Sequence, residues 1–167
     1  MPLFEPIFQA LDAAGVRYVA VGGVAVVLHG HARLTTDLDL AVDLAPEPAA
    51  KAITALTNLG FRPRAPVHAM DFADPSKRQQ WIEQQGMTVF SLWDPNDPLR
   101  SVDLFVVDPI DFEELWANSK LVDLTGTSAR IASIPDLIRL KRIANRPIDL
   151  ADIGSLEAIL ANQEEES

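Results

Sequence analysis

The chain has 167 residues, of which 48% are hydrophobic and 23% charged, and its formal net charge is −10. These values suit one globular domain and argue against a largely disordered chain. A strongly acidic balance also argues against a general nucleic-acid coat protein, which needs a basic face. The absence of cysteine rules out a disulfide framework and a thiolate metal site. The longest apolar run, residues 18–28, is too short to span a bilayer, so the cytoplasm is the expected compartment.

Hydrophobic periodicity and the positions of glycine and proline predict the elements in chain order. The first half is expected to contain a helix over 3–14, a strand over 17–21, a helix over 22–28, a strand over 36–42 and a helix over 46–59. Loop-rich residues 61–74 then precede a helix over 76–85, a strand over 87–93, a turn over 94–98 and a strand over 101–107. The last part is expected to contain a helix over 111–118, short strands over 120–123 and 129–132, and helices over 135–144 and 149–162. This order predicts an α+β fold, with a mixed sheet flanked by helices and a C-terminal helical pair.

Two aspartates stand at alternate positions in an apolar strand. Asp37 and Asp39 would therefore share one face of that strand while Leu38 and Leu40 point to the other. Asp103 has the same relation to its apolar neighbours, so three carboxylates would converge if the two strands lie side by side. Two carboxylates about 5 Å apart repel by roughly 3 kcal/mol at an effective dielectric near 20, which a cation would offset. Oxygen ligands without cysteine or clustered histidine favour Mg²⁺ or Mn²⁺ over Zn²⁺; the alternative is a solvated sheet face.

Gly22 and Gly23 follow a predicted strand and begin a predicted helix. Glycine lets the backbone approach a ligand closely, and amides at a helix N-terminus favour an anion such as phosphate. The alternative is a plain tight turn. The pair is neither a Walker loop nor a GxGxxG fingerprint, because the later lysine or glycines are missing.

The helix over 135–144 places Lys141 on its apolar, core-facing stripe, four residues after Leu137. Residues 130–146 hold five of the fourteen basic residues, so an anionic ligand is plausible there. Lys141 would either reach a buried anion such as a triphosphate, pair with an aspartate, or extend its amine out to solvent. In the next helix, Asp149 and Asp152 stand at i and i+3, and the favourable helix dipole is an ordinary reason for Asp149.

Two other groups of residues suggest a metal site and a nucleic-acid contact. His29 and His31 do not share a helix face and have no third ligand nearby, which disfavours a metal site. Lys77, Arg78 and Trp81 would suit stacking on a base or contact with RNA phosphates. A solvated helix face with a half-buried tryptophan is the simpler expectation for them.

Together these features resemble the nucleotidyltransferase superfamily with the DNA polymerase β-like fold. The resemblance rests on Gly22-Gly23, on Asp37-Leu38-Asp39 within RLTTDLDL, and on Asp103 in a later strand. The segment DLIRLKRIANRPIDLADI is similar to a motif of nucleotidyltransferase toxins from abortive-infection toxin–antitoxin systems; its matching residues are Asp136, Lys141, Arg146, Asp149 and Asp152. The resemblance implies a catalytic core over 1–133 and a C-terminal helical segment over 134–167 packed on the same domain.

The resemblance also implies an activity, the transfer of NMP from an NTP to an acceptor with release of pyrophosphate. Asp37, Asp39 and Asp103 would be the catalytic and metal-binding residues for Mg²⁺ or Mn²⁺, with Asp103 as general base. The acceptor is open: a tRNA or other nucleic acid, a protein or a small molecule. A cognate antitoxin is an expected partner if the protein is a toxin, and no membrane association is expected.

Nucleotide binding is implied for five further residues. Gly22 and Gly23 would cradle the β- and γ-phosphates, and Lys141, helped by Arg146, would neutralise phosphate charge. Thr36, with Arg33 and Thr35, borders the acidic strand and would contact phosphate or acceptor. Two alternatives of other classes remain: a non-catalytic nucleotide- or partner-binding module with the same fold, and a phosphohydrolase using the same metals.

Overall fold

The structure is a computed structural model that describes residues 3–166. Its strands form one mixed sheet in the order β3-β4-β5-β2-β1-β7-β6. The strands are β1 (Tyr18–Val21), β2 (Asp37–Val42), β3 (Arg62–Pro63), β4 (Val89–Asp94), β5 (Asp97–Phe105), β6 (Lys120–Leu124) and β7 (Thr127–Ile131). The central strand β2 pairs antiparallel with β1 and parallel with β5.

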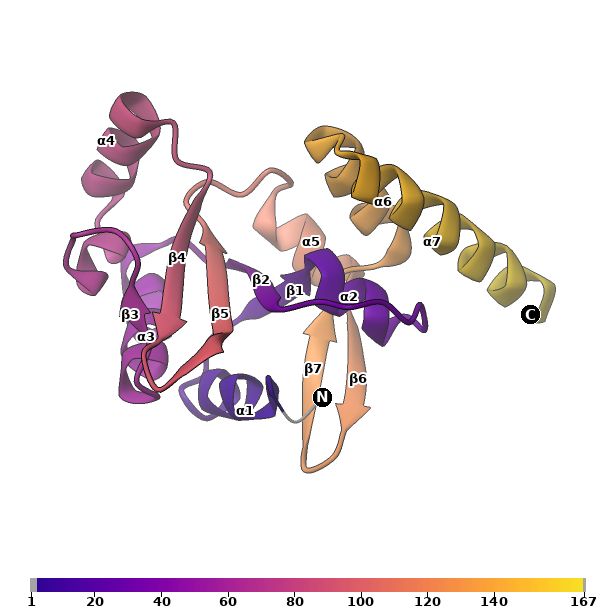
Figure 1. Cartoon of the computed structure of the whole chain (residues 1–167), viewed down its shortest axis with the longest axis horizontal. Helices are drawn as coiled ribbons and strands as arrows, with labels where there is room; N and C mark the ends of the chain where they lie inside the picture. The colour runs from indigo at the N-terminus through magenta and orange to yellow at the C-terminus, as the bar shows by residue number, and fades with distance from the viewer. Residues whose placement is uncertain (1–2, 167) are drawn as a thin grey trace.

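Helices surround this sheet and end the chain (Figure 1). They are α1 (Glu5–Ala13), α2 (Gly22–Leu28), α3 (Pro46–Asn58), α4 (Pro75–Gln85), α5 (Phe112–Asn118), α6 (Ile134–Ala144) and α7 (Pro147–Glu166). Helix α6 packs along α7, and the C-terminal half of α7 projects away from the sheet. The predicted α+β fold, with a mixed sheet flanked by helices and a C-terminal helical pair, is therefore confirmed. No helix among the described residues is long and apolar enough to cross a membrane.

The core explains why the acidic strand faces one way. Leu38 and Leu40 of β2 have no exposed surface, and neither do Val102 and Leu104 of β5. Because side chains alternate along a strand, burying these residues turns the intervening aspartates to the opposite face. The hydrophobic core thus fixes the side of the sheet on which the polar site is built.

A second part of the core lies under α4 and overturns one expectation. Trp81 is 5% exposed and stacks on Phe90, with ring centroids 5.0 Å apart. The Arg78 side chain is also buried, and its guanidinium donates to the backbone carbonyls of Phe72 and Leu44. The expectation of a solvated face with a half-buried tryptophan was therefore wrong for Arg78 and Trp81, and so was stacking on a nucleic acid. These hydrogen bonds connect α4 to the 3₁₀ helix over Ala69–Ala73 and to the segment just after β2.

Three segments differ from the sequence prediction. Residues 61–74 are not all loop, because they contain β3 and the 3₁₀ helix over Ala69–Ala73. The turn expected over 94–98 occupies only residues 95–96, because the Asp94 carboxylate accepts from the Asn96 amide and closes the turn within two residues. Helix α7 begins at Pro147 and continues to Glu166, beyond the expected range of 149–162.

Candidate functional site

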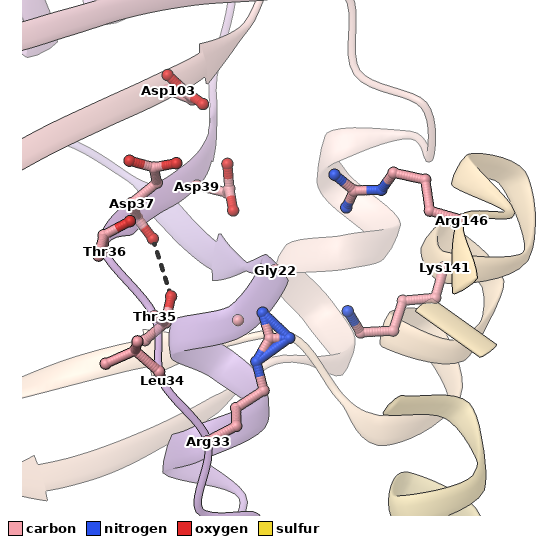
Figure 2. A pocket seen from close by; sticks show the side chains of 11 residues that line it. Gly22, Arg33, Leu34, Thr35, Thr36, Asp37, Asp39, Asp103, Lys141 and Arg146 are labelled. Atoms are coloured by element: carbon pink, nitrogen blue, oxygen red, sulfur yellow. Dashed lines mark hydrogen bonds between the residues drawn. The ribbon is translucent and has the colours of Figure 1, made fainter. Parts of the chain in front are cut away.

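The pairing of β2 with β5 brings the predicted acidic residues together. Asp39 stands directly opposite Asp103 in the parallel register, and Asp37 stands opposite Ser101. All three aspartates line one pocket with a volume of about 290 Å³. The predicted nucleotide-binding residues line the same pocket: Gly22, Gly23, Thr36, Lys141 and Arg146. Figure 2 shows the aspartates on one side of this pocket and Lys141 and Arg146 on the other, with Gly22 between them.

The three carboxylates are electrostatically coupled. Burial, followed by the nearby charges of Asp103 and Asp37, raises the pKa of Asp39 to about 7. Burial also raises the pKa of Asp103, while a hydrogen bond from Ser91 Oγ, 2.6 Å from Asp103 Oδ1, opposes that rise. A site that holds negative charge at this cost gains stability when a cation binds.

The donor set suits a hard divalent cation. Within residues 3–166, no three carboxylate or imidazole groups form a preformed metal cluster. Like-charge repulsion is a physical reason for this spacing, and Ser91 holds one oxygen of Asp103. The pocket nevertheless offers three carboxylates from paired strands and no sulfur or imidazole ligand. These oxygen atoms fit Mg²⁺ or Mn²⁺ better than Zn²⁺.

The two glycines leave room for the side chains of the site. Gly22 has φ +68°, and a Cβ atom there would overlap the carboxylate of Asp39. A Cβ atom on Gly23 would lie 2.7 Å from Thr35 Oγ1 and 2.8 Å from an Arg33 guanidinium nitrogen. The glycine pair therefore does more than form a tight turn, because it lets Asp39, Thr35 and Arg33 approach the start of α2.

Lys141 is held inside the protein by an ion pair. Its side chain is 6% exposed, and Nζ lies 2.8 Å from Asp152 Oδ2 and 3.6 Å from Asp149 Oδ1. The prediction that Lys141 lies on the buried stripe of its helix is confirmed, and its extension to solvent is excluded. Pairing with an aspartate is the alternative that the structure shows, and it leaves Lys141 lining the pocket.

Asp149 is held by the turn that joins α6 to α7. The Arg146 guanidinium donates to both of its carboxylate oxygens, at 2.8 and 3.1 Å, and the Arg146 backbone amide donates at 3.0 Å. Burial opposes ionisation, but these hydrogen bonds hold the pKa of Asp149 below its ordinary value. Asp149 is thus anchored at the start of α7, as the dipole argument anticipated, and it also fixes Arg146 at the pocket.

Arg33 joins the loop before β2 to the last helix. Its Nη1 atom donates to Asp152 Oδ2 at 2.9 Å, while its buried Nε has no hydrogen-bond partner. In the sequence, the position of Arg33 just before the acidic strand was the signal for a role at this site. The same Asp152 oxygen lies 2.8 Å from Lys141 Nζ, so the carboxylate joins two cations from distant parts of the chain.

We expect Gly22→Ala to disrupt the site. A left-handed backbone costs a non-glycine residue roughly 1–2 kcal/mol, and the added methyl group would displace Asp39. Urea unfolding should show a loss of at least that size. Gly154→Ala is the matched control, because a Cβ atom there meets nothing within 4 Å inside α7. Helix propensity predicts a gain of about 1 kcal/mol for this control; equal effects of the two changes would contradict the interpretation.

Asp39→Asn should stabilise the metal-free protein at alkaline pH. The folded pKa lies above the unfolded value near 3.8, so ionisation of Asp39 removes stability as the pH rises from about 4 to about 7. Asparagine does not ionise, and the advantage is at most about 4 kcal/mol. Melting temperatures measured in chelator should therefore favour the variant more at pH 8 than at pH 5. A variant that melts below the wild type at pH 8 would show that the carboxylate is structural.

Comparison with known proteins gives structural neighbours only. No protein-family model matches the sequence, and no curated protein matches it. The lincosamide antibiotic adenylyltransferase LnuA, solved with lincomycin bound, superposes with a TM-score of 0.63 at 16% identity, over 95% of this chain and 96% of that chain. The antibiotic-resistance factor ANT(2'')-Ia gives 0.60 at 17% identity, over 99% and 84%.

A third neighbour has a similar overall structure. An antigenic nucleotidyltransferase-like protein from Paracoccidioides brasiliensis superposes with a TM-score of 0.54 at 19% identity, over 96% of this chain and 84% of that chain. The match to all three neighbours extends over nearly the whole chain. The chain therefore has the fold of the nucleotidyltransferase superfamily.

Proposed function

We propose that the protein is a metal-dependent nucleotidyltransferase that moves NMP from an NTP to a hydroxyl group of an acceptor. The observation that carries the proposal is the meeting of three aspartates, two glycines and three cationic side chains in one pocket. The shared fold of the neighbouring nucleotidyltransferases supports the same class of reaction.

The carboxylates have separate tasks in this proposal. Asp37, Asp39 and Asp103 would hold Mg²⁺ or Mn²⁺, which supplies charge neutralisation and polarises the α-phosphate when bound. Asp103 would accept the proton of the acceptor hydroxyl. The acceptor oxygen bonds to the α-phosphorus, and the bond to the bridging oxygen breaks. That electron pair leaves with pyrophosphate.

The remaining residues would hold the triphosphate. Gly22 and Gly23 allow the phosphates to approach the backbone, while Thr36 borders the opening of the pocket beside Asp37. Lys141 and Arg146 face the aspartates across the pocket and would neutralise phosphate charge. Arg33 would also bind phosphate, because among the described residues its Nε hydrogen has no acceptor.

The neighbours suggest which acceptors to test first. LnuA is an adenylyltransferase solved with lincomycin, and ANT(2'')-Ia has been solved in complex with adenylyl-2''-tobramycin. Both support ATP as donor and a small molecule as acceptor for this chain. A toxin role, a cognate antitoxin and a cytoplasmic location stay predictions from the sequence.

Label transfer tests the proposed reaction. The protein is incubated with each α-³²P-labelled NTP, with Mg²⁺ or Mn²⁺, and with RNA, protein and small-molecule fractions of a cell extract. We expect transfer by the wild type and at least a hundredfold loss in Asp39→Asn, because the variant lacks one carboxylate of the cluster. NTP binding without transfer to any fraction would instead favour a non-catalytic nucleotide-binding module.

Lys141→Ala should weaken NTP binding by about 10- to 100-fold, the loss expected for one charge-assisted contact of roughly 1.5–3 kcal/mol. Asp152 keeps Arg33 as a partner and Asp149 keeps Arg146, so the variant should still fold. Arg142→Ala is the neighbouring control, because the Arg142 side chain is 65% exposed and pairs with the similarly exposed Glu157. An unchanged NTP affinity in a folded Lys141→Ala protein would restrict Lys141 to a structural ion pair.

A further inference from the structure

A second cavity opens from the catalytic pocket. Its volume is about 550 Å³, and it shares Gly22, Asp39, Asp103, Lys141 and Arg146 with the first pocket. The rest of its lining is largely apolar and comes from two sides. Phe105 and Val107 lie at the end of β5 and just beyond it.

The second part of the apolar lining comes from α6. Leu140, Ile143 and Ala144 form it, and two apolar side chains stand exposed: Val107 is 55% and Ile143 64% exposed. An exposed apolar pair beside a concave polar site is typical of a ligand groove. The volume also falls within the range of roughly 300–1,000 Å³ that small-molecule sites occupy.

The charges of the groove limit what can bind there. Its cations, Lys141 and Arg146, are already paired with Asp152 and Asp149. Its other acids, Asp39 and Asp103, belong to the proposed reaction centre. Lys141 and Arg146 belong to the proposed triphosphate site, so the groove lining has no further cation for a polyanion such as RNA and no further unpaired carboxylate for a polycation. Apolar contact is what most of its wall can provide.

The position of the groove distinguishes it from the phosphate end of the site. The first pocket alone contains Gly23, Arg33 and Thr35, so pyrophosphate would leave toward that side. In-line displacement places the attacking oxygen opposite the leaving group. The groove lacks these three residues but reaches Asp103, the proposed base.

We propose that this groove binds the apolar body of an uncharged or weakly charged, hydroxyl-bearing small molecule and presents its hydroxyl group to Asp103. This inference rests on the proposed function. The acceptor oxygen bonds to the α-phosphorus of the NTP, pyrophosphate leaves with the electron pair of the broken bond, and the hydroxyl proton passes to the Asp103 carboxylate. Val107 and Ile143 bind substrate here and take no part in bond making.

The first test uses an apolar probe and two neutral substitutions. N-phenyl-1-naphthylamine should bind the wild type, and Val107→Asn or Ile143→Asn should weaken its binding at least tenfold, while Ile143→Leu preserves it. Leu121→Asn is the control, because Leu121 is 55% exposed, as Val107 is, but lies on the distant edge strand β6. Affinity for a non-hydrolysable NTP should be the same in all variants. Lower NTP affinity in the groove variants would overturn the proposal, because the groove would then hold the nucleoside.

The second test identifies the labelled product with the same variants. We expect label from α-³²P-NTP in a butanol-extractable compound that resists nuclease and protease, with at least tenfold less in Ile143→Asn than in Leu121→Asn. Label in RNA or protein would overturn the groove assignment while leaving the transferase activity standing. A small-molecule product made equally well by Ile143→Asn would also overturn the groove assignment and leave the transferase activity standing. Absence of Asp39-dependent label from every fraction would refute the transferase itself and with it this inference.

Discussion

The parallel pairing of β2 with β5 holds two carboxylates beside each other at a place where water cannot fully screen them. The pairing is fixed from the other face of the sheet, where Leu38 and Val102 are completely buried. A slip of one residue would bury the aspartates and expose the leucines, so the apolar core strongly specifies this register. The repulsion between Asp39 and Asp103 is therefore sustained by hydrophobic burial on the far side of the same strands. A cation and a triphosphate bound at this edge would relieve a cost that the fold already bears.

The last two helices contribute to the pocket through charge. Lys141 and Arg146 both lie beyond residue 133, in the helical segment predicted to pack on the same domain as the catalytic core, and they face the aspartates across the pocket. Asp149 and Asp152 hold these cations in place, at the cost of burying two acids that must remain paired. The helical segment therefore supplies cations to a pocket whose central carboxylates come from the sheet.

Local pattern was sufficient for the acidic residues, because alternation in a strand is a short-range signal and the flanking residues are unambiguously apolar. It was also sufficient for Lys141, since a charge on a buried helical stripe can be read from four neighbouring residues. Arg33 carried no such signal, because its partner Asp152 is far away in the sequence. Trp81 and Arg78 were misjudged because α4 is polar on average, and only tertiary contacts with Phe90 and Phe72 reveal their burial. The early start of β5 depended on the Asp94 side chain closing the turn, which composition alone does not reveal.

The hydrogen bond between Arg33 and Asp152 spans 119 residues of chain, whereas the β4–β5 hairpin closes over two. The pairing of β1 with β7 closes a loop of similar length, because Ala20 stands opposite Ile131. The entropy of closing a large loop is therefore a cost that the sheet itself already meets. The Arg33–Asp152 contact adds to a chain whose distant parts are already joined, and it connects the last helix to the loop before β2. A ligand that bound only this joined arrangement would stabilise it in proportion to the logarithm of the ligand concentration.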